Sequence, residues 1–329
     1  MLTPLNEKHY NAFKDLISHE HIYNPWFTGE FVIRAIQGIV HMLDREVLTR
    51  WMDPYAGSLK FSRNPRTVGL VMAGNIPLVG FHDFMSVLAT GHSILAKPSS
   101  RDDRLIRSVA DVLADIDPSL KDRITFTEEY LKGVDAVIAT GSDNSSRYFE
   151  YYFRNMPHII RRNRNGVAVL TGSESREELQ GIGDDIFTFF GLGCRNVTKL
   201  YLPGSFEIPV LLEALEIYGY LYQHHKYGNN VDYYRTIYLM NRIPFLENGV
   251  LLVKEDQAIA SPVGVVYYER YSDMDTLQEV LASRSEEIQC CVSIHPALPA
   301  AILPGTSQKP LPWDYADGID TIRFLTELN

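Results

Sequence analysis

The sequence places a cysteine in a glycine-rich turn between a predicted helix and a predicted strand. Cys194 follows Gly191 and Gly193, with a predicted helix over 178–190 before the turn and an apolar strand over 199–202 after it. Glycines permit a tight backbone and let a second molecule approach the sulfur closely. A cysteine presented in this way could act as a nucleophile toward a carbonyl carbon.

Two cationic residues follow the cysteine closely. Positive charge from Arg195 and Lys199 would favour the thiolate, which is the nucleophilic form of a cysteine. The alternative is that Cys194 is a small buried hydrophobe, the usual role of a free cysteine. The other two cysteines, Cys290 and Cys291, are adjacent in an apolar stretch, and we expect them to be inert.

The composition is that of an ordinary globular protein of about two domains. The chain has 329 residues, of which 45% are hydrophobic and 22% charged. A net charge of −10 argues against nucleic-acid binding, which depends on neutralising phosphates. The odd number of cysteines favours a reducing compartment over a disulfide framework. Because the sequence shows no signal peptide, membrane span or metal-ligand spacing, we expect a cytoplasmic protein that binds no metal.

The order of the predicted elements indicates an α/β fold. A helical layer over 5–53 and a Pro-, Gly- and Ser-rich linker over 53–65 precede a regular alternation of strands and helices. We expect strands at 67–73, 92–97, 134–139, 167–170, 199–202, 249–254, 263–268 and 288–294, and helices at 81–89, 102–114, 144–153, 207–222, 274–283 and 321–328. Such alternation predicts parallel sheets covered by helices on both faces.

Polar residues stand at the ends of three of these strands. Asn75 and Lys97 each come at or after the end of a strand, and Thr140, Gly141 and Ser142 follow a third. In parallel sheets, ligands bind beyond the carboxyl ends of the strands. We therefore expect these residues to lie at one edge of a sheet and to face a ligand.

Together these stretches resemble the aldehyde dehydrogenase superfamily. More narrowly, they resemble the bacterial acyl-CoA reductases related to the fatty-acid reductase subunit of bioluminescence systems. The resemblance runs over 67–294 and rests on the order of the motifs, with Cys194 about fifty residues beyond the Thr-Gly-Ser turn. It implies two Rossmann-type parallel-sheet domains with the active site in the cleft between them. We expect a nucleotide-binding domain with its helical layer over 1–165, a catalytic domain over 166–310 and a tail over 311–329.

The resemblance also implies roles for individual residues. Cys194 is in the position of the nucleophile, and Asn75, within 71–78, is in the position of the oxyanion donor. Lys97, within 91–100, matches the residue on which the adenosine ribose rests. The turn formed by Thr140, Gly141 and Ser142 matches the one under the pyrophosphate of the cofactor.

Two departures from the family pattern bear on the reaction. Hydrolytic members have a glutamate before a pair of glycines, which activates water; the corresponding stretch here, 159–166, contains no carboxylate. The glutamate that usually holds the nicotinamide ribose is replaced by Ala258. A reductase should lack the water-activating base, because hydrolysis would destroy the acyl-enzyme before hydride arrives. The sequence therefore favours reduction of an acyl-CoA to an aldehyde over oxidation of an aldehyde.

The cofactor expected from the resemblance is NADPH, with NADH as the alternative. Ser99 stands where NAD-preferring relatives often have a glutamate, so a repulsion against a 2′-phosphate is absent. Arg101 and Arg104 could attract that phosphate, although both could equally be solvated helix residues. Three further arginines, at positions 161, 162 and 164, could meet the phosphates of coenzyme A or lie in a solvated loop.

Other functions remain open at this point. The chain could be an aldehyde dehydrogenase that oxidises aldehydes, or a non-catalytic or partner-dependent subunit of a multienzyme complex with the same fold. A cysteine hydrolase is a further alternative, but no His/Asn pair stands at an identifiable spacing. The protein could also form a homodimer.

Overall fold

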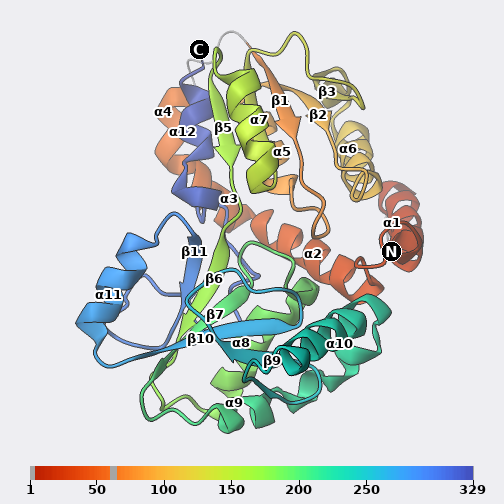
Figure 1. Cartoon of the computed structure of the whole chain (residues 1–329). Coiled ribbons are helices and arrows are strands. Elements are labelled where there is room, and N and C mark those ends of the chain that lie inside the picture. Colours follow the sequence, from red (N-terminus) through yellow and green to blue (C-terminus); the bar gives the residue numbers. More distant parts are fainter. Residues whose placement is uncertain (1–3, 60–64, 329) are drawn as a thin grey trace. The chain divides into compact units, whose positions relative to one another are not determined.

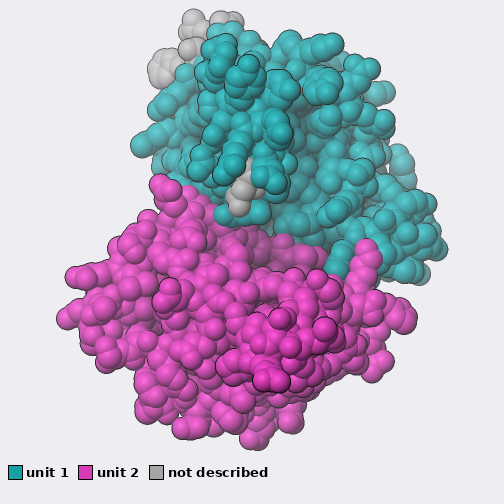
Figure 2. Space-filling view, in the orientation of Figure 1, with its two compact units in different colours: residues 1–163, 311–329 teal, residues 164–310 magenta. Residues whose placement is uncertain are grey.

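The computed structural model describes residues 4–59 and 65–328, which divide into two compact units. Unit 1 comprises residues 1–163 and 311–329, and unit 2 comprises residues 164–310 (Figure 2). Each unit has its own sheet (Figure 1). In the described part of the chain, no helix has the length and apolar character needed to cross a membrane.

Unit 1 is built on a five-stranded parallel sheet. Its strands lie in the order β3-β2-β1-β4-β5. Their bounds are Thr67–Val71 for β1, Ser93–Lys97 for β2, Ile124–Phe126 for β3, Ala136–Thr140 for β4 and His158–Arg161 for β5. The strand order reverses at β1, which has β2 on one side and β4 on the other. A reversal of this kind is where open parallel sheets bind their ligands.

The helices of unit 1 come mainly from the N-terminal layer and from the crossovers between strands. They are α1 (Pro4–Tyr23), α2 (Gly29–Met42), α3 (Arg45–Met52), α4 (Ala56–Leu59), α5 (Phe81–Ala89), α6 (Arg104–Ile116), α7 (Asp143–Phe153) and α12 (Thr321–Thr326). Side chains cap several of them: Thr28 begins α2, Asp44 begins α3 and Ser142 begins α7. Gly91, at φ +87°, follows α5 in the left-handed conformation expected of a helix end.

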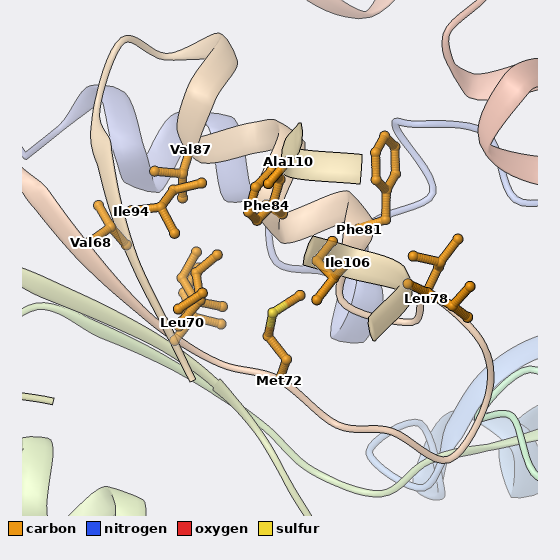
Figure 3. Packing of buried hydrophobic residues seen from close by; sticks show 14 of the residues in the cluster. Val68, Leu70, Met72, Leu78, Phe81, Phe84, Val87, Ile94, Ile106 and Ala110 are labelled. Atoms are coloured by element: carbon orange, nitrogen blue, oxygen red, sulfur yellow. The ribbon is translucent and has the colours of Figure 1, made fainter. Parts of the chain in front are cut away.

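The hydrophobic core of unit 1 forms between β1 and the helices that follow β1 and β2. Figure 3 shows the side chains of β1 and of the loop after it facing those of α5 and α6. Its labelled members are Val68, Leu70, Met72, Leu78, Phe81, Phe84, Val87, Ile94, Ile106 and Ala110. Leu325 of α12 belongs to the same cluster, so the end of the chain is part of this core.

Polar contacts also hold the C-terminal segment in unit 1. Arg161 is buried and pairs with Asp83 at 2.6 Å, while its guanidinium donates to the backbone oxygen of Ala316 at 2.7 Å and to Thr321 Oγ1 at 2.8 Å. Trp51 donates to the hydroxyl of Tyr315 at 2.8 Å. Burial would raise the pKa of Asp83, but Arg161 and His82 hold it well below its usual range.

Unit 2 is built on a six-stranded sheet in the order β11-β6-β7-β10-β9-β8. The strands are β6 (Asn165–Val169), β7 (Val197–Pro203), β8 (Leu246–Glu247), β9 (Leu252–Glu255), β10 (Val265–Tyr271) and β11 (Ile288–Val292). All neighbours are parallel except the short edge strand β8, which is antiparallel to β9. The helices are α8 (Arg176–Phe187), α9 (Ile208–Ala214), α10 (His225–Met240) and α11 (Met274–Ser283).

The observed elements depart from the expected ones in a few places. Residues 53–59 form a 3₁₀ turn (Asp53–Tyr55) and α4 rather than a linker, with Pro54 in the first turn, where proline favours a helix start. The rest of the expected linker, 60–64, lies outside the described residues. Strands β3 and β5 were not expected. The two α/β units agree with the expected fold class.

Candidate functional site

In unit 1, the strand ends that carry the predicted cofactor residues lie side by side. Val71, the last residue of β1, is in register with Lys97 of β2 on one side and with Ala139 of β4 on the other. The segments that follow these strands therefore leave the sheet at the same edge. Those segments contain Asn75, Ser99 and the Thr140–Ser142 turn, as expected.

The loop that carries Asn75 packs closely against the segment after β2. A Cβ atom on Gly74 would lie 2.7 Å from Cβ and Oγ of Ser99, so only glycine allows this approach. Asn75 is half-buried, and its side-chain oxygen Oδ1 is shielded from solvent. Leu78, three residues later, adopts a left-handed conformation at φ +58°, which is rare for a side chain of this kind. The loop is thus held in a specific, partly strained shape.

The predicted cofactor residues after β2 have distinct surroundings. The ammonium group of half-buried Lys97 lies 5.5 Å from the ring centroid of Tyr130. The hydroxyl of Ser99 accepts a hydrogen bond of 3.2 Å from the backbone N–H of Arg101, whose side chain is exposed. Arg104 instead pairs with the buried Glu20 at 3.2 Å and lies over the ring of Tyr23. Arg104 is thus neither the solvated residue nor the unpaired cation that the sequence allowed, because this side chain fastens α6 to α1.

The Thr-Gly-Ser turn forms the start of a helix. Ser142 is the N-cap of α7, and its hydroxyl accepts a hydrogen bond of 3.4 Å from the backbone N–H of Ser145. A Cβ atom on Gly141 would lie 2.8 Å from Ser145 Cβ and 2.9 Å from the ring of Phe149, so the glycine lets the turn pack on its own helix. The first N–H groups of a helix and its dipole favour an anion such as a pyrophosphate.

The three arginines that could meet the phosphates of coenzyme A each have a different partner in the structure. Arg161 is buried in its pair with Asp83. Arg162 pairs at the surface with Glu150, at 2.5 Å. Arg164 belongs to unit 2, where it donates to the backbone oxygen of Ser285 at 3.0 Å. Each of the three thus has a structural partner of its own.

In unit 2, Cys194 follows a backbone turn of unusual conformation. Phe189, Phe190 and Gly191 have φ values of +55°, +56° and +75° in succession. Left-handed geometry costs roughly 1–2 kcal/mol for each non-glycine residue, so other contacts must compensate. The ring of Phe190 stacks on His224 at 4.3 Å between centroids and lies 5.6 Å from the ring of Tyr227. This packing holds the turn in place.

Asn196, which the sequence analysis did not single out, fixes the same turn from the other side. Its side chain is fully buried. The carboxamide oxygen accepts a hydrogen bond of 2.8 Å from the backbone N–H of Gly193, and the amide group donates to the backbone oxygens of Asp185 and Thr188 at 2.9 and 2.8 Å. Asn196 therefore ties the residue before Cys194 to the end of α8.

A buried carboxylate, that of Asp185, connects α8 to the segment around Ser307. Asp185, 1% exposed, accepts hydrogen bonds from the backbone N–H groups of Gly305 at 2.7 Å and Ser307 at 2.9 Å. Arg195 donates to the backbone oxygen of Ser307 at 2.7 Å. Burial raises the pKa of Asp185 to about 6, against its hydrogen bonds to this segment. The sequence alone pointed to a buried position for Asp185, because this residue falls three positions after Ile182 on the apolar face of its helix.

Lys199, whose charge was expected to favour the Cys194 thiolate, has partners of its own in the structure. Its side chain is fully buried, pairs with Glu269 at 2.6 Å and donates to the backbone oxygen of Asp256. Burial lowers the pKa of Lys199, and Glu269 opposes that change. The charge of Lys199 is thus compensated locally. The segment that carries Ala258 is nearby, because the next residue, Ile259, accepts a hydrogen bond of 2.8 Å from Thr198 of β7.

The two other cysteines lie in β11. Burial raises the pKa of Cys291 to about 12, which keeps its thiol protonated and agrees with an inert residue. Cys290 lies with its sulfur 3.7 Å from the backbone oxygen of Arg195. Across the described residues, no group of three metal-ligating side chains is placed to hold a metal ion.

A family model described as acyl-CoA reductase (LuxC) matches residues 7–208, a stretch that includes the three strand-end segments of unit 1 and the Cys194 turn. The chain belongs to this acyl-CoA reductase family. The resemblance inferred from the sequence is therefore confirmed.

One relative of this chain is described as a long-chain acyl-protein thioester reductase from Aliivibrio fischeri. The two are 25% identical, over 54% of this chain and 39% of the relative. This chain thus matches well under half of the relative's length.

Similarity to solved structures shows the fold of this chain. A NAD-dependent aldehyde dehydrogenase from Sinorhizobium meliloti is similar with a TM-score of 0.56 and 14% identity, over 71% of this chain and 56% of that chain. An aldehyde dehydrogenase from Bacillus cereus, solved as an NAD⁺ complex, gives a TM-score of 0.53 and 15% identity, over 73% of this chain and 61% of that chain. The aldehyde-dehydrogenase-like fold is therefore confirmed.

Proposed function

We propose that this chain reduces an acyl thioester, with acyl-CoA as the donor, to an aldehyde, using NADPH and a thioacyl intermediate on Cys194. The observation that carries the proposal is the Cys194 turn, which Asn196 and the left-handed Phe189–Gly191 segment preform in a member of the acyl-CoA reductase family. The similarity to the Aliivibrio fischeri relative, described as a long-chain acyl-protein thioester reductase, supports the same reaction class.

In this proposal the reaction begins with acyl transfer to the cysteine. The Cys194 thiolate attacks the thioester carbonyl, a new C–S bond forms, and the thiolate of coenzyme A leaves with the electrons of the broken bond. The side-chain amide of Asn75 and the backbone N–H of Cys194 donate to the oxyanion, and one such donor contributes on the order of 10²–10³ in rate. Thiolate replaces thiolate, so acylation needs no strong acid or base.

Bound NADPH would supply the hydride that reduces the thioacyl group. The hemithioacetal on Cys194 then collapses to the aldehyde and regenerates the thiolate. The residues of unit 1 fit a dinucleotide: Lys97 and Ser99 leave the sheet beside its reversal point for the adenosine ribose, and Thr140, Gly141 and Ser142 begin α7 for the pyrophosphate. Arg101, exposed next to Ser99, adds attraction for a 2′-phosphate.

The absence of a carboxylate from residues 159–166 supports reduction over hydrolysis. Arg161, in the middle of that stretch, is a cation paired with Asp83, and a guanidinium has no acceptor with which to activate water. The second candidate function, a partner-dependent subunit of a multienzyme complex, is favoured by Ala258, which cannot hold the nicotinamide ribose as a glutamate would.

The test is NADPH absorbance after mixing the protein with acyl-CoAs of several chain lengths, beside Cys194→Ala. NADPH consumption with release of coenzyme A thiol, abolished by the substitution, would support the reductase and define its chain-length range. Thiol release without NADPH consumption would indicate a thioesterase instead. If no acyl-CoA reacts, the reductase proposal fails for the isolated chain and the partner-dependent alternative gains weight.

A further inference from the structure

Asp102, in the connection between β2 and α6, contacts the loop that carries Asn75. Its carboxylate oxygen Oδ2 accepts a hydrogen bond of 2.6 Å from the backbone N–H of Leu78. Asp102 is only 5% exposed, and the contact joins segments 24 residues apart in the sequence. The backbone N–H of Asp102 itself donates to the carbonyl of Ser99 at 2.9 Å, which fixes the carboxyl group relative to the end of β2.

Asp102 accepts its hydrogen bond from Leu78, the residue of the loop with the strained backbone conformation. Leu78 has φ +58°, and its side chain is anchored in the unit 1 core beside Phe81 (Figure 3). Its carbonyl accepts a hydrogen bond of 3.0 Å from the N–H of Phe81, at the start of α5. A left-handed leucine costs roughly 1–2 kcal/mol, so it persists only where its surroundings hold it. The bond to Asp102 is a local contact that opposes relaxation of this turn.

The same segment supports the loop at a second point. Gly74, immediately before Asn75, approaches Ser99 so closely that a Cβ atom there would lie 2.7 Å from the Ser99 side chain. Asn24, after α1, donates to the backbone oxygen of Arg101 at 3.2 Å and so fixes the segment that contains Ser99 and Asp102. Asn75 therefore lies between two fixed points, Gly74 and Leu78, both set by residues 99–102.

The surroundings of Asp102 favour an uncharged acceptor. Its other oxygen, Oδ1, is buried and has no hydrogen-bond partner among residues 4–59 and 65–328. Burial raises the pKa of Asp102 well above its usual range, and the nearby carboxylates of Glu20 and Asp103 add to this effect. Glu20 is itself paired with Arg104, and Asp103 with Arg107.

We infer that Asp102 is a positioning residue for the proposed reaction: its carboxyl group holds the Leu78 N–H and so fixes the orientation of the Asn75 side chain. The inference rests on the proposed function, in which Asn75 donates to the oxyanion. Misplacing a catalytic group by about 1 Å can reduce a rate by up to 10²-fold. An amide in place of the carboxyl keeps an acceptor for Leu78, whereas a methyl group does not.

The test is a double-mutant cycle on the rate of coenzyme A release in a single turnover. Asp102→Ala should slow acylation roughly 10–100-fold, and Asn75→Ala roughly 10²–10³-fold. In the Asn75→Ala background, Asp102→Ala should add less than about threefold, because groups that act as a unit are not additive. Asp102→Asn should restore the rate to within about threefold of wild type. Asp103→Ala, next in the chain, is the matched control and should leave the rate unchanged.

Hydrogen exchange of the peptide over 73–81 provides a readout that does not depend on activity. Asp102→Ala should speed exchange there, and Asp102→Asn should not. Unchanged exchange in Asp102→Ala, or multiplicative rate losses in the double variant, would overturn the inference. If Asn75→Ala keeps full activity, the proposed role of Asn75 fails, and the role inferred for Asp102 fails with it. If the wild type releases no coenzyme A, the proposed function fails, while the exchange data still decide whether Asp102 holds the turn.

Discussion

Asn196 and Gly193 are joined by a buried hydrogen bond of 2.8 Å, from the backbone N–H of Gly193 to the side-chain oxygen of Asn196. The bond closes the turn formed by residues 193–196, which contains Cys194. Because the amide of Asn196 also donates to carbonyls at the end of α8, the cysteine is fixed to a helix rather than to a free loop. Nucleophiles held on rigid elements keep the geometry that their reaction requires.

Asn196→Ala should therefore destabilise the protein by about 2–4 kcal/mol, since it leaves buried backbone groups without partners. It should also lower acylation at least tenfold at temperatures where the variant is folded. Asn196→Asp should be no better, because a carboxylate would face the carbonyls of Asp185 and Thr188. The matched control is Asn241→Ala, at the exposed end of α10, whose side chain donates to the backbone oxygen of Ile237 in the same helix. Urea unfolding and a thiol-release assay would check both; equal effects in the two alanine variants would contradict the role of Asn196.

Two neighbouring arginines should differ sharply in their effect on stability. Arg161→Met removes a buried cation and leaves Asp83 uncompensated, so we expect a loss of about 3–5 kcal/mol in unfolding free energy. Arg162→Ala removes an exposed pair with Glu150 and should cost about 1 kcal/mol or less. Denaturant unfolding of both variants measures the difference. A small loss for Arg161→Met would contradict its role in holding the C-terminal segment.

The pH dependence of stability should carry a contribution from Asp185. Its folded-state pKa of about 6 lies above the ordinary value of 3.8, so its stabilising contribution is complete below about pH 4 and is lost as the pH rises through 6. The loss should amount to about 3 kcal/mol. Asp185→Asn does not titrate, so its unfolding free energy relative to wild type should increase between pH 4 and pH 7. A constant difference across this range would contradict the raised pKa.

Cofactor preference should depend on the residue at position 99. Ser99→Glu would place a carboxylate at the position proposed for the adenosine ribose, where it would repel a 2′-phosphate and accept hydrogen bonds from free hydroxyls. We expect the ratio of NADPH to NADH affinity to fall at least tenfold, as measured by nicotinamide fluorescence. Ser100→Glu, at the exposed neighbouring position, should change the ratio by less than about threefold. An unchanged ratio in Ser99→Glu would place the cofactor elsewhere.

Local patterns in the sequence were enough to predict much of the fold. The helices Phe81–Ala89 and Met274–Ser283 have the expected bounds, because both their apolar spacing and their end signals are local. β5 was missed because its Arg161 reads as a surface charge until Asp83, 78 residues away, is brought beside it. The end of each strand can also be recognised from the neighbouring residues, which is why Asn75 and Lys97 could be placed at one sheet edge.

The supporting residues of the site could not be predicted in the same way. Asn196 and Asp102 are ordinary polar residues in the sequence, and their importance comes from backbone groups that tertiary structure brings to them. The left-handed Phe189 and Phe190 carry no glycine or asparagine signal, since aromatic packing rather than local preference holds them. A candidate nucleophile such as Cys194 can be proposed from the turn that carries it, whereas the residues that hold the turn can be found only from the fold.

The most direct test of the account is covalent capture on Cys194. The protein would be mixed with a long-chain acyl-CoA without NADPH, digested and analysed by mass spectrometry, with Cys290→Ser and Cys194→Ser as parallel samples. We predict about one equivalent of coenzyme A released and the acyl mass on the peptide containing Cys194, lost on adding NADPH and absent in Cys194→Ser. An unmodified Cys194 in protein that consumes NADPH and acyl-CoA would contradict the central claim, as would an acyl group found only on another residue.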